Sequence, residues 1–140
     1  MELGQKLKMI DNSIKKKANS DLQEMDLTVA QHRTLVHLAR REDGCAELKE
    51  LEREFCVAQA TMAGIAQRLE AKGYVCAFQS PTDKRVKLIR LTDTGRELTV
   101  RSFRKMQARM DRVLAALTPR EVEELNRLLD KVNKTLQKDD

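Results

Sequence analysis

The chain has 140 residues, of which 35% are charged and only 3% are aromatic, and Lys and Arg exceed Asp and Glu by 27 to 22. This length is enough for one domain with a buried core, and the scarcity of Gly (5) and Pro (2) is typical of helices rather than of an all-β fold. No apolar run approaches the ~20 residues of a membrane span, and the amino-terminal segment has no signal-peptide pattern. We therefore expect a mainly helical, cytoplasmic protein without a membrane-bound part.

The first half of the chain has helical periodicity. Apolar residues from Leu3 to Leu22 recur every three or four positions, which predicts an amphipathic helix. A second helix is predicted to follow Thr28, because Thr28 and Gln31 form a capping-box pattern. A short third helix is followed within a few residues by a fourth, over about 58–72, which is the arrangement of a helix-turn-helix. The predicted buried face of the fourth helix consists of Met62, Ile65, Ala66 and Leu69.

The segment from Gly73 to Gly95 reads GYVCAFQSPTDKRVKLIRLTDTG. A short apolar strand, a Pro-Thr-Asp turn and a strand that alternates basic and apolar residues predict a β-hairpin with Asp83, Lys84 and Arg85 at its tip. Residues 79–90 carry four basic side chains and one acidic one, whereas the last 22 residues carry five basic and six acidic ones. Positive charge therefore gathers at the hairpin, which is typical of the wing of a winged helix-turn-helix.

The carboxyl-terminal part of the chain is predicted to contain two further helices. Residues from Asp93 to Leu117 have the pattern of one long helix, and a final helix is predicted to begin at Thr118-Pro119. Their apolar faces exceed what a small winged helix can cover, and a second copy of the chain could cover them. We therefore expect residues 1–140 to form one domain in which 1–25 and 93–140 are dimerisation helices and 27–92 is the DNA-binding lobe. The alternative is a separate monomeric bundle.

Three segments carry a family resemblance: LTVAQHRTLVHL, ATMAGIAQRLEAKGYV and SPTDKRVKLIRLTDTG. The most specific feature is Asp-x-Arg at the hairpin tip, followed by Leu-Thr-x-x-Gly at the start of the long helix. In these segments the chain resembles the MarR family of bacterial transcription regulators over nearly its whole length. The resemblance implies a winged helix-turn-helix homodimer that binds a palindromic operator, usually as a repressor released by a small ligand or by thiol oxidation.

The wing is predicted to provide the main contact with DNA. The resemblance implies that Arg85 enters the minor groove and that Asp83 orients the hairpin tip. The physical reason is that a narrow minor groove has an enhanced negative potential that attracts a cation. Lys84 and Lys87 would add phosphate contacts. The alternative is an ordinary polar turn with a weak surface ion pair.

The fourth helix is predicted to be the recognition helix, with 58–72 in the major groove and wing 80–87 in the adjoining minor groove. A two-fold dimer would then bind an inverted repeat whose half-site centres are roughly 10 bp apart. Ala63 and Gly64 stand where typical relatives have Ser or Thr and a basic residue. Direct readout is therefore left to Gln59 and Gln67, which can pair with adenine, with Thr61 as a further candidate. We therefore predict an A·T-rich operator; the alternative is a solvated helix face. The predicted DNA-facing residues of this helix are Gln59, Ala60, Thr61, Ala63, Gly64, Gln67 and Arg68.

Cysteine and histidine give no metal or disulfide pattern. The spacing of Cys45, Cys56 and Cys76 fits neither a disulfide framework nor a zinc knuckle. Cys56, beside a helix amino terminus, is a candidate redox sensor, and its alternative role is that of a small buried apolar residue. His32 and His37 would point ~140° apart on a helix, so they form no chelating pair. With no catalytic arrangement in the sequence, we expect neither an enzyme nor a cofactor.

An effector and a competing function complete the predictions. The resemblance implies a pocket for a small-molecule effector between the dimer helices and the DNA lobe. Met9, Ile10, Leu35 and residues of the long helix are expected to line it. The competing function is a winged-helix protein-interaction module with only weak, non-specific DNA binding. The small side chains on the outward face of 59–67 favour that alternative.

Overall fold

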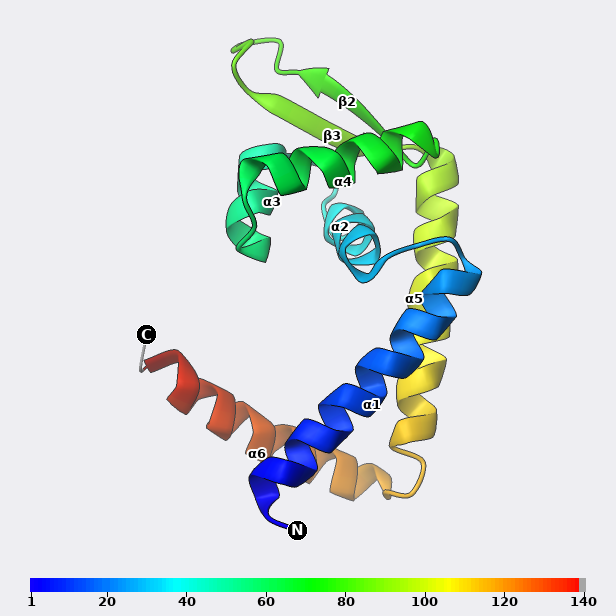
Figure 1. Ribbon diagram of the computed structural model, residues 1–140, viewed down its shortest axis with the longest axis vertical. Coiled ribbons are helices and arrows are strands. Elements are labelled where there is room, and N and C mark those ends of the chain that lie inside the picture. The colour runs from blue at the N-terminus through cyan, green and yellow to red at the C-terminus, as the bar shows by residue number, and fades with distance from the viewer. Residues whose placement is uncertain (139–140) are drawn as a thin grey trace. The chain divides into compact units, whose positions relative to one another are not determined.

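The computed structural model describes residues 1–138, and the chain divides into two compact units, residues 1–106 and the residues from 107 onward. The predicted mainly helical fold with a hairpin wing is confirmed (Figure 1). No helix within residues 1–138 is both long enough and apolar enough to cross a membrane. The elements are α1 (Leu3–Glu24), α2 (Val29–Ala39), β1 (Cys45–Glu47), α3 (Leu48–Phe55), α4 (Gln59–Ala71), β2 (Val75–Gln79), β3 (Lys87–Leu91), α5 (Asp93–Val113) and α6 (Pro119–Lys138).

The wing belongs to a three-stranded antiparallel sheet with the order β1-β3-β2. Ala46 pairs with Ile89, and Ile89 pairs with Ala77 on the other side. Strand β1 was not predicted, because three residues are too few to show an alternating pattern. Its pairing with β3 fixes the base of the wing to the segment that leads into α3, so the wing and the helix-turn-helix share one support.

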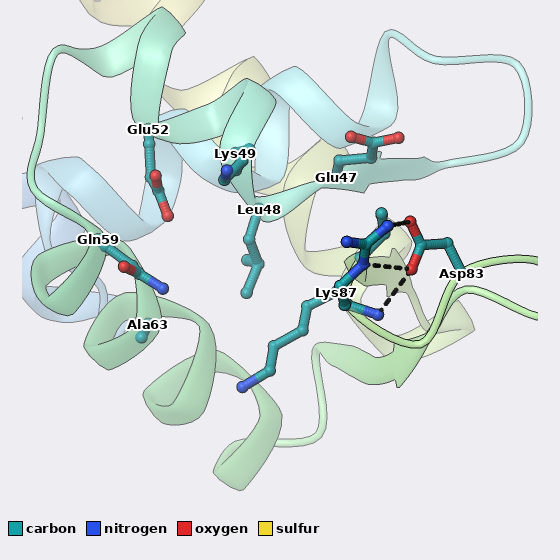
Figure 2. A pocket seen from close by; sticks show the side chains of 10 residues that line it. Glu47, Leu48, Lys49, Glu52, Gln59, Ala63, Asp83 and Lys87 are labelled. Atoms are coloured by element: carbon teal, nitrogen blue, oxygen red, sulfur yellow. Dashed lines mark hydrogen bonds and ion pairs between the residues drawn. The ribbon is translucent and has the colours of Figure 1, made fainter.

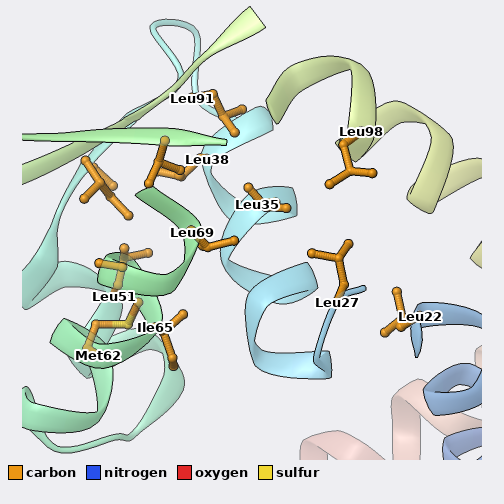
Figure 3. Packing of buried hydrophobic residues seen from close by; sticks show 14 residues of the cluster. Leu22, Leu27, Leu35, Leu38, Leu51, Met62, Ile65, Leu69, Leu91 and Leu98 are labelled. Atoms are coloured by element: carbon orange, nitrogen blue, oxygen red, sulfur yellow. The ribbon is translucent and has the colours of Figure 1, made fainter. Parts of the chain in front are cut away.

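The core of the first unit lies among α2, α3, α4 and the inner face of the sheet (Figure 3). All four residues predicted for the buried face of α4 are buried, and Met62 and Leu69 have no exposed surface. Helix α4 packs against α3, β2 and α2, so burial of its apolar side orients its other side toward solvent. The buried apolar residues of this core include Leu22, Leu27, Leu35, Leu38, Leu51, Met62, Ile65, Leu69, Val75, Ile89, Leu91 and Leu98.

The turn between α1 and α2 holds the carboxyl end of α4. The predicted capping box is present: the Gln31 backbone N–H donates to Thr28 Oγ1 at 3.1 Å, and the Thr28 N–H donates to Gln31 Oε1 at 3.2 Å. Lys72, the C-cap of α4, donates to the same Gln31 Oε1 at 3.2 Å and to the backbone oxygen of Asp26 at 2.5 Å. A cation at this end also interacts favourably with the helix dipole.

The Leu-Thr-x-x-Gly motif joins the wing to α5. Thr92 Oγ1 donates to the backbone oxygen of Gly73 at 2.6 Å and accepts from the Gly95 N–H at 3.0 Å. A Cβ atom at Gly95 would lie 2.0 Å from the backbone oxygen of Tyr74, so only glycine allows this approach. The motif therefore ties the start of α5 to the turn between α4 and β2.

The second unit differs from the prediction at the end of the long helix. Helix α5 ends at Val113 rather than at Leu117, and bonds from Ala115 N–H to Arg112 O and from Leu117 N–H to Leu114 O form a turn. The prediction was wrong here because Leu114 and Leu117 continue the apolar period through the turn.

The predicted start of α6 is confirmed. The Glu121 N–H donates to Thr118 Oγ1 at 3.2 Å, and the Thr118 N–H donates to Glu121 Oε2 at 2.8 Å. The described part of α6 buries no residue within the chain. Its exposed apolar residues are Leu125, Leu128, Leu129, Val132 and Leu136.

Candidate nucleic-acid interface

The wing tip is organised by one carboxylate. Asp83 Oδ1 accepts hydrogen bonds from the Arg85 backbone N–H at 3.0 Å and from Arg85 Nε at 3.2 Å, and Asp83 Oδ2 accepts from Arg85 Nη2 at 3.3 Å. The side-chain bond, and then the backbone bond, hold the pKa of Asp83 below its ordinary value of 3.8. The Arg85 side chain remains 91% exposed. The guanidinium is therefore oriented by the protein and still open to a ligand.

The remainder of the wing loop is closed by backbone hydrogen bonds. The Ser80 N–H donates to Val86 O at 2.8 Å, and the Val86 N–H donates to Asp83 O at 3.0 Å. Lys84 and Lys87 are exposed on either side of Arg85. The loop thus displays three cations from a backbone that is already hydrogen-bonded, which lowers the ordering entropy that binding would cost.

The outer face of α4 is shallow. Ala63 and Gly64 are half-buried, and a Cβ atom at Gly64 would meet nothing closer than Arg68 Nη1, at 3.7 Å. Ala58, the N-cap residue, makes no side-chain capping bond. This face therefore has room for a groove of DNA to approach the backbone of α4 closely. The other predicted contact residues of this helix are exposed: Gln59, Ala60, Thr61, Gln67 and Arg68.

The wing and α4 face a common cavity of about 370 Å³ (Figure 2). Five of the predicted contact residues line it, namely Gln59, Ala63, Asp83, Arg85 and Lys87. The other predicted residues do not line this cavity: Ala60, Thr61, Gly64, Gln67, Arg68 and Lys84. The structure therefore brings the first turns of α4 and the wing tip to one surface, while the rest of the predicted helix face lies outside the cavity.

The end of β1 and helix α3 form the third wall of this cavity, which was missed from the sequence. The lining residues are Glu47 of β1 and Leu48, Lys49 and Glu52 of α3. Lys49 and Glu52 are one helical turn apart, so they share a face. This spacing was the signal that could have identified them.

The cysteines occupy two different environments. Cys56 is exposed in a left-handed conformation (φ 52°) at the end of α3, so the alternative that it is a small buried apolar residue is wrong. Cys45 is the buried one, and burial raises the pKa of its thiol, an effect that Arg90 partly offsets. Of the three thiols, Cys56 and Cys76 are the ones accessible to an oxidant.

The residues expected to line the effector pocket differ in exposure, and both histidines have polar neighbours. Leu35 is fully buried, so the expectation that it lines an open pocket is wrong, whereas Met9 and Ile10 are about half exposed. His32 Nδ1 lies 3.1 Å from Ser102 Oγ, and burial lowers the pKa of His32. His37 Nε2 lies 3.4 Å from Glu50 Oε1. Both histidines thus join α2 to neighbouring helices.

The helix-turn-helix, the sheet and the exposed cationic hairpin define a winged helix-turn-helix protein. Residues 27–87 match the family model described as the MarR family. The uncharacterised HTH-type transcriptional regulator YxaD of Bacillus subtilis is 33% identical over 93 residues, which are 66% of this chain and 65% of that regulator. The chain thus spans slightly less than two thirds of this relative.

Two further relatives extend the match. The HTH-type transcriptional repressor IacR of Pseudomonas putida is 29% identical over 116 residues, which are 83% of this chain and 68% of IacR. The crystal structure of a mutant MarR from Escherichia coli complexed with operator DNA matches with a TM-score of 0.76 and 29% identity, over 93% of this chain and 92% of that one. Residues 27–87 therefore match the MarR family, and over most of its length the chain is similar to transcription regulators that include MarR itself.

Proposed function

We propose that this protein is a homodimeric repressor that binds an inverted-repeat operator, with α4 in the major groove and wing 80–87 in the adjoining minor groove. The observation that carries the proposal is the Asp83–Arg85 arrangement, which holds an exposed guanidinium beside the outer face of α4. The operator DNA bound to MarR and the similarity to the transcriptional repressor IacR support the same function.

The wing supplies most of the binding free energy in this proposal. A guanidinium that is already oriented loses little entropy on entering a narrow minor groove, where the negative potential is enhanced. Lys84 and Lys87 neutralise flanking phosphates, so affinity falls steeply as the salt concentration rises. This part of the binding free energy depends on the shape and charge of the DNA rather than on base identity.

Helix α4 supplies the base discrimination. Gln59 and Gln67 are exposed and can each form a bidentate pair with adenine, while Ala60 and Ala63 can contact thymine methyl groups. Thr61 and Arg68, at the margins of this face, reach the phosphates. The preferred operator is therefore A·T-rich, and its sequence is read through a small number of contacts.

Dimerisation is proposed to use residues 1–25 and 93–140, leaving 27–92 as the DNA-binding lobe. Within α6, Leu128 and Leu129 are 45% and 44% exposed, and within α1 Leu7 is 45% exposed, although each belongs to an apolar helix face. A second copy would remove these faces from water. Two α4 helices related by a two-fold axis then reach half-sites whose centres are roughly 10 bp apart.

The dimer has its own test. Leu129→Glu places a charge on the apolar face of α6, whereas Asn126→Glu places the same charge at an exposed polar position of that helix. Light scattering after size exclusion should give a monomer for Leu129→Glu that no longer binds operator DNA, and a dimer for Asn126→Glu. A Leu129→Glu protein that remains a dimer contradicts this assignment.

Release of the operator is proposed to follow binding of a small ligand or oxidation of a thiol. Cys56 is exposed in the turn between α3 and α4, so modification there would act on the recognition helix directly. Peroxide should then release operator DNA from the wild-type protein and leave it bound to Cys56→Ser. Equal release from both proteins would assign the trigger elsewhere.

The decisive experiment is selection of bound DNA from a random pool at moderate salt, with the wild type and Arg85→Ala in parallel. We expect an inverted A·T-rich repeat for the wild type and strongly reduced enrichment for Arg85→Ala. A pool that remains random, or an enrichment indifferent to Arg85, would instead favour a winged-helix protein-interaction module.

A further inference from the structure

A glutamate projects into the cavity that the wing shares with α4. Glu52 lies on α3, and in Figure 2 its carboxylate points toward the side chain of Gln59, the first residue of α4. Ala63, one turn further along α4, lies on the same wall. Glu52 therefore belongs to the surface that contacts DNA under the proposed function, even though its charge has the same sign as that of the phosphates.

Two of the acidic side chains around Glu52 already have partners, whereas Glu47, which lines the same cavity, has none within residues 1–138 and is exposed rather than half-buried. Asp83 is engaged by Arg85, and Glu50 of the same helix accepts from Arg41 Nη1 and lies 3.4 Å from His37 Nε2. Within residues 1–138, the carboxylate of Glu52 has no hydrogen bond or ion pair, and it is half-buried. Its hydrogen-bonding capacity is thus available to a ligand.

A carboxylate in such a position discriminates between parts of DNA. It can only accept hydrogen bonds, and in the major groove the cytosine N4 amino group is the donor that Glu and Asp pair with. Phosphate oxygens offer no proton and repel it. A carboxylate at the edge of the recognition surface therefore favours cytosine. It disfavours any register of the protein on DNA in which the carboxylate lies against phosphates.

We propose that Glu52 is a specificity-determining residue, which accepts a hydrogen bond from cytosine N4 at the base pair facing the amino-terminal end of α4 and weakens binding to DNA in every other register. This inference rests on the proposed operator-binding function. It places a defined C·G pair at the edge of an otherwise A·T-rich half-site, and it assigns discrimination to α3 as well as to α4.

The matched variants are Glu52→Gln and Glu54→Gln. Both remove one negative charge from α3, but Glu54 is exposed and does not line the cavity. Each protein is titrated with the operator selected by the wild type, with that operator carrying the C·G pair changed to T·A, and with a scrambled duplex of equal length.

For Glu52→Gln we expect tighter binding to the scrambled duplex, no tighter binding to the operator, and therefore a fall of about tenfold in the ratio of the two affinities. The change from C·G to T·A should weaken binding by the wild type and by Glu54→Gln, and leave binding by Glu52→Gln unaffected. These results support the proposal.

The proposal is overturned if Glu52→Gln changes the affinities for all three duplexes by one common factor, as expected for Glu54→Gln. Glu52 would then act only through net charge. Thermal unfolding of both variants checks that the lobe stays folded. If the wild type selects an operator that depends on Arg85 while the ratio stays unchanged, only the role of Glu52 fails. If the wild type selects no operator, the proposed function and this inference fail together.

Discussion

The wing tip and the outer face of α4 differ in their charge and in how their side chains are held. The wing tip is charged, and three hydrogen bonds between Asp83 and Arg85 fix it before any ligand is present. The outer face of α4 is composed of small and neutral residues, its N-cap Ala58 makes no side-chain bond, and Gly64 lies in its middle. Under the proposed function, this difference would concentrate binding strength in the wing and leave α4 to supply fit and a few base contacts.

The two regions nevertheless depend on one junction. Thr92, which follows the wing, donates to the backbone oxygen of Gly73, which follows α4, and Gly95 lies against the backbone oxygen of Tyr74. Substitutions at this junction should disturb the wing and α4 together. Substitutions within one of the two regions should change the contribution of that region alone.

The largest effect is expected for Gly95→Ala. The added Cβ atom would lie 2.0 Å from a backbone oxygen that cannot rotate away, so the junction must open. We expect a loss of about 3 kcal/mol or more in the free energy of unfolding, together with loss of DNA binding. Urea denaturation measures the first quantity. Gly4→Ala, where a Cβ atom has no neighbour within 4 Å, is the control and should be close to neutral.

Arg85→Ala should remove the contribution of the wing to DNA binding and leave that of α4 unchanged. We expect a loss of about 10- to 100-fold in operator affinity and a decrease of about one in the slope of log K against log salt concentration, with unfolding unchanged. Titrations at several salt concentrations measure both values. Arg104→Ala removes the same charge from an exposed position on α5 and should change neither. Equal effects from the two variants would assign the role of Arg85 to net charge alone.

A smaller effect of opposite sign is expected for Gly64→Ala. The new Cβ atom would lie 3.7 Å from its nearest neighbour, and alanine is favoured over glycine inside a helix by about 1 kcal/mol. The variant should therefore unfold at a higher temperature, yet bind the operator more weakly because the methyl group occupies the face that approaches DNA. Stabilisation with unchanged operator affinity would show that Gly64 does not face the groove.

The smallest effect concerns the carboxylate of the wing. Hydrogen bonds from Arg85 lower the pKa of Asp83, so the ordered tip is fully favoured above the ordinary value of 3.8 and is lost only as the pH falls through the lowered pKa. Carboxyl NMR titration should show that Arg85→Ala returns the pKa of Asp83 toward 3.8, with no change in stability near neutral pH. A pKa that stays low without Arg85 would mean that the tip is ordered by other contacts.

Several elements could be predicted from local sequence because their determinants are close together in the chain. Thr28 and Gln31 cap α2 across one helical turn, Thr118 and Glu121 do the same for α6, and the period of Met62, Ile65 and Leu69 identifies the buried face of α4. The wing was recognisable from its turn residues and its charge. Each of these features depends on side chains and backbone groups no more than a few positions apart.

Other features depend on partners that are distant in the sequence. Strand β1 exists because Ala46 pairs with Ile89, and the end of α5 was hidden because the apolar period continues through the following turn.

The sequence by itself determined the helix-turn-helix, the wing and the charge of its tip, since periodicity, capping and turn chemistry are local. Only the tertiary structure decided that Cys56 is exposed, that Leu35 is sealed in the core and that Glu52 lines the cavity between α4 and the wing. Burial and shared surfaces result from packing between elements far apart in the chain, which no local pattern contains.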